Sequence, residues 1–307
     1  MKLFEQALND ISVDRLTDHI RAIEGIRHPV TAPEALERAA RYIHDTLDSL
    51  GYNSCDQDFT DGGATFSNVI ATRSGTLQPE RRILVIAHFD TVSNSPGADD
   101  NASGVAVVLE LATVLKGLSF EKTIHFIGVN LEENASEGSR HTGTRGSQAL
   151  ARFAREQGWD IEAVLVLESV AYGWKSATQL VPPGVPMEAP DSGDFIAVVG
   201  NADSKGLVQE FGRVVERHQI ELAYIPLVVP GNGEMVDDTR RSDHAPFWDQ
   251  GYRAIMLTDT TNFRNPHYHQ PTDTLETLNI PFAAQVCRAT GALLMQLAGV
   301  QEVKARP

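Results

Sequence analysis

Short apolar runs alternate with segments of helical periodicity along most of this chain. The apolar runs predict buried strands at residues 66–72, 83–87, 123–129, 163–167, 195–199, 224–229 and 254–257. Apolar residues at helical spacing predict helices at 13–24, 31–50, 103–116, 147–157, 204–218, 243–250 and 280–298. Strands that alternate with helices indicate an α/β fold in which helices cover both faces of the sheet.

Some of the predicted helices carry start signals. Thr31 and Glu34 form a capping box, and Pro33 stands just inside the same helix. Ser103 and Ser242 stand where the N-terminal caps of two later helices are expected. These signals set the expected boundaries of three helices.

Neither composition nor loop length divides the chain into domains. There is no internal repeat and no low-complexity tract. Two long loops are expected, one at 172–194, rich in Pro and Gly, and one at 230–242, which combines Gly with acids and Arg. Long loops in a compact domain often act as functional lids. The sequence therefore predicts a single domain over residues 1–307.

Charge and composition disfavour some binding partners and exclude a disulfide-based fold. The 307 residues carry a net charge of -15, which disfavours nucleic acid and anionic membranes as partners. Only Cys55 and Cys287 are present, outside any metal-like spacing, which excludes a disulfide framework. The N-terminal segment lacks the apolar core of a signal peptide, and no stretch reads as a membrane span. We therefore expect a cytoplasmic protein.

Candidate metal ligands follow several of the predicted strands. His88 comes directly after the apolar run 83–87, and Asp90 stands two residues on, on the same side of an extended chain. A carboxylate there can hold the far nitrogen of a metal-bound imidazole. Asp100 lies in a Gly-containing turn before a helix, although an Asp in such a turn is most often a turn or cap residue.

Two neighbouring glutamates give a sharper signal. Glu132 and Glu133 come directly after the strand predicted at 123–129, and Glu168 ends the run at 163–167. Adjacent like charges repel each other unless a cation binds one of them. One glutamate could then ligate a metal while its neighbour serves as a general base for bound water. A plain surface acid pair is the alternative.

Two further histidines near the C-terminus are candidate ligands. These are His267 and His269, and the spacing to Asp273, which could orient an imidazole or cap the next helix, favours His269. His244 is expected to form hydrogen bonds near the site rather than to ligate. Ligands bind at the carboxyl ends of strands in α/β sheets, and imidazole with carboxylate suits zinc-type ions.

These segments, taken together and in order, resemble a known family. The likeness lies in residues 88–104, 130–133, 167–168, 242–247 and 267–274. They are similar to the metal-binding motifs of peptidase family twenty-eight, zinc exopeptidases of the MH clan. That family includes bacterial aminopeptidases, glutamate carboxypeptidases and glutaminyl cyclases. The resemblance implies a three-layer α/β/α sandwich, with a mixed, mostly parallel sheet of about eight strands and metals at the strand carboxyl ends.

The resemblance also implies a role for each matching residue. It assigns the ligands of two zinc ions as His88 and Glu168 for one, Glu133 and His269 for the other, and Asp100 as a bridge. Asp90 would be the carboxylate behind the ligands. Glu132 would be the base that activates water, and Tyr268 would polarise the scissile carbonyl.

The chain departs from the commonest family pattern in two places. Glu168 stands where aminopeptidases usually carry Asp, and its longer side chain would reshape the pocket near the substrate terminus. Residues 134–146 form a polar insertion after Glu133, which could be a rim or flap of the site or a plain surface loop.

Together these inferences predict a dizinc exopeptidase, first of all an aminopeptidase, that acts on a peptide or small amide. Glu168 keeps open a carboxypeptidase or related deacylase, as does the pair Arg240 and Arg241, of which Arg241 could contact a substrate carboxylate. A glutaminyl cyclase and a non-catalytic, receptor-like relative are further alternatives, but the complete set of ligands disfavours both. Side-chain specificity, native metal and oligomeric state stay open.

Overall fold

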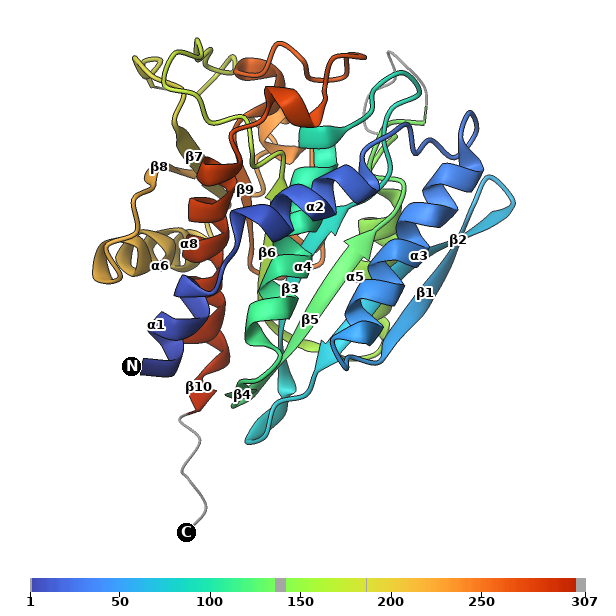
Figure 1. Ribbon diagram of the computed structural model, residues 1–307, viewed down its shortest axis with the longest axis vertical. Coiled ribbons are helices and arrows are strands. Elements are labelled where there is room, and N and C mark those ends of the chain that lie inside the picture. Colours follow the sequence, from blue (N-terminus) through green and yellow to red (C-terminus); the bar gives the residue numbers. More distant parts are fainter. Residues whose placement is uncertain (1, 136–141, 186, 302–307) are drawn as a thin grey trace.

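The computed structural model describes residues 2–135, 142–185 and 187–301. Its centre is an eight-stranded sheet in the order β1-β2-β5-β3-β6-β9-β7-β8 (Figure 1). The strands are β1 (Ser54–Asp61), β2 (Ala64–Arg73), β3 (Gln78–His88), β5 (Lys122–Val129), β6 (Asp160–Glu168), β7 (Phe195–Gly200), β8 (Ala223–Val228) and β9 (Ala254–Thr258). Two short strands, β4 (Ser119–Phe120) and β10 (Val300–Gln301), pair separately.

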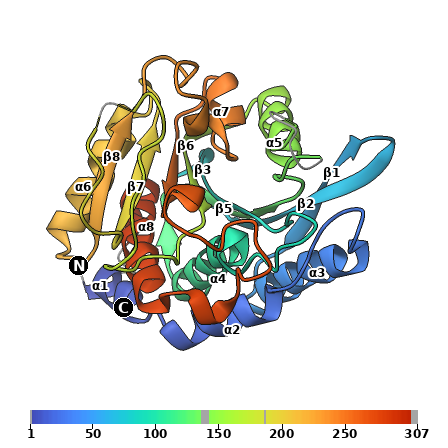
Figure 2. The same ribbon diagram turned by 90° about the horizontal axis from the view of Figure 1, so that it is seen from above.

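Helices cover the two faces of the sheet unequally (Figure 2). One face carries α1 (Lys2–Asn9), α2 (Val13–Ile23), α3 (Pro33–Ser49), α4 (Gly104–Leu115), α6 (Lys205–Arg217) and α8 (Ile280–Ala298). The other carries α5 (Arg145–Glu156) and α7 (Ala245–Asp249). Among the described residues, no helix is long and apolar enough to cross a membrane.

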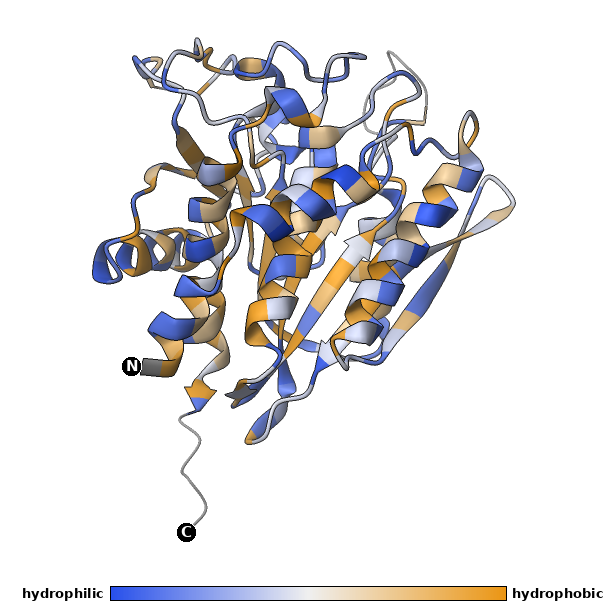
Figure 3. Ribbon diagram, in the orientation of Figure 1, coloured by the Kyte–Doolittle hydropathy of each residue, from blue (hydrophilic) through white to orange (hydrophobic). Residues whose placement is uncertain are grey.

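The two faces explain the apolar strands (Figure 3). In β3, Ile83, Val85 and Ala87 belong to the larger core beneath α4 and α8. Leu84 and Ile86, which alternate with them, belong to the smaller core beneath α5 and α7. Successive side chains of a strand point to opposite faces, so a strand buried on both faces is apolar throughout. The structure confirms the expected three-layer α/β/α architecture.

Strand direction decides where a site can form. The neighbours β5, β3, β6 and β9 run parallel, so their carboxyl ends lie at one edge of the sheet. At one side β2 runs antiparallel to β5, and β1 runs antiparallel to β2. At the other side β7 runs antiparallel to β9, and β8 runs parallel to β7. The loops that follow the parallel strands gather at the upper end of the molecule in Figure 1. The sheet is thus mixed and mostly parallel, as expected.

The elements that the pattern did not predict are amphipathic or polar. Helix α1 is short, and β1 is an edge strand whose side chains are mostly exposed or half-buried. The capping predictions were wrong for α3 and α4. Helix α3 begins after Ala32 without a side-chain cap. Ser103 instead donates to the carbonyl of Asp99, while the side-chain oxygen of Asn101 accepts from the N–H of Gly104.

Candidate active site

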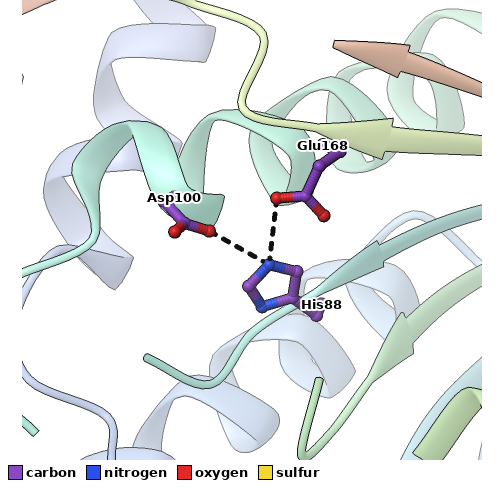
Figure 4. A group of neighbouring side chains, drawn as sticks. All are labelled: His88, Asp100 and Glu168. Carbon is purple, nitrogen blue, oxygen red and sulfur yellow. Dashed lines mark ion pairs between the residues drawn. The ribbon is translucent and has the colours of Figure 1, made fainter. Parts of the chain in front are cut away.

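Five acidic and histidine side chains meet in two groups that share Asp100. In the first group, His88 Nε2 lies 3.1 Å from Asp100 Oδ1 and 3.5 Å from Glu168 Oε1 (Figure 4). In the second, His269 Nε2 lies 3.2 Å from Asp100 Oδ2 and 3.2 Å from Glu133 Oε1. The two oxygens of one carboxylate therefore face two different imidazoles.

The parallel strands deliver most of these residues to one edge. His88 is the last residue of β3 and Glu168 the last of β6, while Glu133 follows β5. Asp100 comes from the turn Ala98–Ser103, directly before α4, and His269 from the loop that leads to α8. Five residues that are far apart in sequence are thus brought together at the predicted edge.

The facing atoms fit a bound cation better than they fit each other. His88 Nε2, Asp100 Oδ1, Glu133 Oε1 and His269 Nε2 are buried, yet none has a hydrogen-bond partner among the described residues. Buried polar atoms nearly always have one, so such a cluster requires an explanation. Imidazole nitrogen and carboxylate oxygen are ordinary zinc ligands, and an ion in each group would satisfy these atoms.

Asp90 supports the site from behind and does more than the sequence suggested. Its Oδ1 lies 3.4 Å from His88 Nδ1, the contact expected of a carboxylate that orients an imidazole. The same carboxylate also accepts the backbone N–H groups of Glu132 and Glu133 at 3.0 and 3.1 Å. Asp90 therefore links His88 to the turn that carries both glutamates.

Two side chains have roles other than those predicted. Ser242 caps no helix, because its hydroxyl donates to Glu168 Oε2 at 2.6 Å and so fixes that carboxylate. Asp273 does not orient His269. Its two oxygens accept the backbone N–H groups of Asp99 and Asp100 at 2.9 and 3.2 Å, which holds the turn that presents Asp100.

Arg27 is a buried support that sequence reasoning missed. Its guanidinium, fully enclosed, donates to the carbonyls of Phe89, Pro96 and Gly97 at 2.7, 2.8 and 3.0 Å. These carbonyls belong to the loop between β3 and the turn that carries Asp100. No local pattern marks Arg27, because its partners are main-chain oxygens of a segment that is distant in sequence.

The backbone around the site includes three residues with left-handed dihedral angles. Leu131, Ser169 and His269 have φ angles of 56°, 47° and 57°. For residues with a Cβ this conformation costs roughly 1–2 kcal/mol each. Leu131 directly precedes Glu132, and Ser169 directly follows Glu168. Such strain is usually retained where a functional geometry requires it.

Glu132 and Tyr268 lie beside the two groups of candidate ligands. Within the part of the chain that the structure describes, neither residue belongs to a group. Glu132 Oε2 lies 3.9 Å from His88 Nε2. Both side chains line two cavities that meet at the site, one apolar and one polar. The apolar cavity also receives Phe195, Ile225 and Met256 from three adjacent strands.

The predicted loops form the walls of these cavities. Residues 179–182 and 187 of the Pro- and Gly-rich loop line the apolar cavity. Residues 235–238 of the second loop line the polar one. Of the polar insertion, residues 136–141 lie outside the described residues, but Asn134, Gly143 and Thr144 border the polar cavity. The described ends of the insertion therefore form part of a rim.

The remaining histidines lie outside both groups in the described part of the chain. His267 Nδ1 is hydrogen-bonded to Thr272 Oγ1 at 2.9 Å. His244 is buried, with Nε2 2.8 Å from the carbonyl of Thr239. Burial lowers the pKa of His244 to about 4, which keeps this imidazole neutral.

The carboxylates give the site a strong affinity for positive charge. Burial lowers the pKa of His88, but Glu168 and Glu132 outweigh burial, so that this pKa lies well above its usual range. Burial likewise lowers the pKa of His269, but Glu133 and Asp100 raise it to about 10. Burial raises the pKa of Glu132 well above its usual range. Without a metal, protons on the imidazoles supply the compensating charge.

Metal binding should therefore release protons. At pH 7 His269 is protonated in the metal-free protein, because Glu133 and Asp100 raise its pKa to about 10. The raised pKa of His88 favours the protonated form of that imidazole as well. An ion needs the neutral imidazole, so the apparent affinity should rise by about tenfold per pH unit for each proton displaced, until the pH passes the pKa of His269. Titration calorimetry with zinc at pH 7, in buffers of different ionisation enthalpy, measures this release. A heat that does not depend on the buffer would contradict it.

Comparisons with known proteins agree with this geometry. Residues 68–294 match the model of peptidase family M28. The chain is 33% identical to the uncharacterized protein YfbL of Escherichia coli (strain K12), over 92% of this chain and 88% of that protein. It is 29% identical to aminopeptidase YwaD of Bacillus subtilis (strain 168), over 63% of this chain but only 36% of that longer protein.

Solved structures share the fold at low sequence identity. An aminopeptidase from Aneurinibacillus sp. strain AM-1 superposes with a TM-score of 0.70 at 17% identity, over 99% of this chain and 98% of that one. A glutaminyl cyclase from Porphyromonas gingivalis superposes with a TM-score of 0.68 at 21% identity, over 96% and 98%. The match to the family model and the identity to YfbL decide the assignment: this chain belongs to peptidase family M28, and it is a hydrolase of the zinc metallopeptidase class.

Proposed function

We propose that the chain is a dizinc aminopeptidase that removes the N-terminal residue of peptides. The observation that carries this proposal is the sharing of Asp100 by two groups of ligand atoms. One zinc would be held by His88 and Glu168. The other would be held by Glu133 and His269. Each oxygen of Asp100 would serve one ion.

The residues around the ligands are suited to a hydrolytic step. When bound, zinc supplies Lewis acidity, lowering the pKa of water to about 7 and polarising a carbonyl. Glu132 accepts the proton of the attacking water and delivers it to the amine that leaves, so the proton is conserved through the reaction. Burial raises the pKa of Glu132, which makes its carboxylate a stronger base for this exchange. The hydroxyl of Tyr268 donates a hydrogen bond to the carbonyl oxygen as negative charge develops there.

The two cavities suggest how a peptide lies. The apolar cavity, lined by Leu180, Phe195 and Met256, suits the side chain of the N-terminal residue. The polar cavity, with Thr144 and Gln148 on its wall, suits the peptide that follows. The site holds more carboxylates than two zinc ions would neutralise. The negative potential that remains favours the binding of a substrate with a free α-ammonium group.

A panel of dipeptides and tripeptides tests this proposal. We expect hydrolysis of free-amine peptides with Leu, Met or Phe at the N-terminus. Leu should exceed Ala by about 10-fold or more in kcat/KM, because each buried methylene contributes about 0.8 kcal/mol. N-acetylated peptides should be inert. Equal cleavage of N-acetylated peptides would instead indicate a carboxypeptidase or deacylase. Loss of ammonia from N-terminal glutaminyl peptides would indicate a glutaminyl cyclase.

A further inference from the structure

Arg241 lies against Tyr268 at the point where the two cavities meet. Its Nη2 donates a hydrogen bond to the hydroxyl oxygen of Tyr268 at 3.0 Å. Its guanidinium carbon lies 5.9 Å from the centre of the Tyr268 ring. Nη1 donates to Asn262 Oδ1 at 2.9 Å and to Asp238 Oδ1 at 3.2 Å. The guanidinium is thus held from one side and reaches the tyrosine with the other.

This contact restricts the direction of a single hydrogen atom. A guanidinium has donors and no acceptor, so the hydroxyl oxygen of Tyr268 must accept in this hydrogen bond. The hydroxyl hydrogen therefore cannot point at Arg241 and is available to an acceptor elsewhere. The ring itself is also fixed, because it stacks on His269 with 3.8 Å between the ring centres and 15° between the planes.

We propose that Arg241 is a positioning residue that turns the hydroxyl hydrogen of Tyr268 toward the reacting carbonyl oxygen. The inference rests on the proposed function, in which Tyr268 is the donor. The hydrogen bond from Arg241 also makes the hydroxyl a stronger donor, since hydrogen bonds in a chain polarise and strengthen one another. The hydrogen-bond and ion-pair partners of Arg241 among the described residues are Asp238, Asn262 and Tyr268, none of them a candidate ligand, so it acts on the reaction through the tyrosine.

A different role for Arg241 makes a different prediction. A guanidinium at the meeting point of two cavities could bind the α-carboxylate of a short substrate. Its loss would then raise KM for dipeptides, and it would leave unaffected those substrates that lack a free carboxylate. A residue that positions Tyr268 affects kcat, with or without that carboxylate, because its contribution appears as charge develops on the carbonyl oxygen.

A double-mutant cycle separates these roles. The variants are Arg241→Met, Arg241→Lys, Tyr268→Phe and the double variant Arg241→Met/Tyr268→Phe, assayed on Leu-Ala and on leucine 4-nitroanilide, which has no carboxylate. Arg213→Met is the matched control. Like Arg241, Arg213 forms an ion pair with an acidic residue three positions earlier, Glu210, and its side chain is 60% exposed. Arg241 is itself 41% exposed, so folding should survive its replacement, and thermal unfolding checks this.

We expect Tyr268→Phe to lower kcat by about 10²-fold, the loss typical of one donor to a developing oxyanion. Arg241→Met should lower kcat by about 10-fold on both substrates, and Arg241→Lys should recover most of that loss. The double variant should be no slower than Tyr268→Phe alone. Multiplied effects in the double variant, or a rise in KM confined to Leu-Ala, would overturn the proposal. A wild-type protein that cleaves neither substrate would instead refute the proposed function itself.

Discussion

Replacing Glu132 with Gln is expected to lower kcat by about 10²–10⁴-fold while the metal and the fold are retained. Glu132 stands outside both ligand groups, among the described residues, and its carboxylate lies at the edge of both cavities. An amide keeps the shape and polarity of the side chain but cannot take a proton from water. The loss should therefore fall on kcat and much less on KM.

Glu133 is the matched control for this variant. It is adjacent in sequence, similarly buried, and held by the same carboxylate of Asp90. Its Oε1 faces His269 Nε2 at 3.2 Å, so Glu133→Ala should lose one metal and activity together. Steady-state kinetics and metal analysis of both variants distinguish the roles. If Glu132→Gln keeps a near wild-type kcat, the base lies elsewhere. If it releases metal, the two roles are reversed.

Replacing Asp100 with Ala is expected to disturb both metal ions and to abolish activity. Its Oδ1 faces His88 and its Oδ2 faces His269, at 3.1 and 3.2 Å, so the substitution removes a ligand from each group. The backbone of the turn should persist, because Asp273 holds the N–H of residue 100 rather than its side chain. Metal analysis after dialysis gives the occupancy. Full occupancy in Asp100→Ala would remove Asp100 from the bridging position.

The apolar runs predicted the places of three of the five candidate ligands, and the family resemblance added Asp100 and His269. A parallel sheet places the ends of its strands at one edge, so His88, Glu133 and Glu168 meet without any further information. Among the described residues His269 lies in the second group and His267 in neither, but Asp273 does not orient His269. Asp273 binds the backbone of the Asp100 turn instead.

Supports that act through the main chain could not be predicted. Arg27 binds carbonyl oxygens of a loop more than sixty residues further along, and any residue type can supply a carbonyl. Ser242 was interpreted as a cap because Ser before a helix commonly is one, whereas its hydroxyl binds Glu168. The contact between Arg241 and Tyr268 depends on how two loops fold over the sheet, and no periodicity records that.

The number and place of the metal ions test the central claim most directly. Crystals of the zinc-loaded protein, with diffraction recorded on either side of the zinc absorption edge, locate each ion independently of the protein atoms. Two anomalous peaks are expected, one between His88 and Glu168 and one between Glu133 and His269, with Asp100 between them. Their separation should be roughly 3.5–4 Å, the spacing typical of two-metal hydrolytic sites. A single peak at full zinc loading, or peaks away from Asp100, would contradict a shared two-metal site.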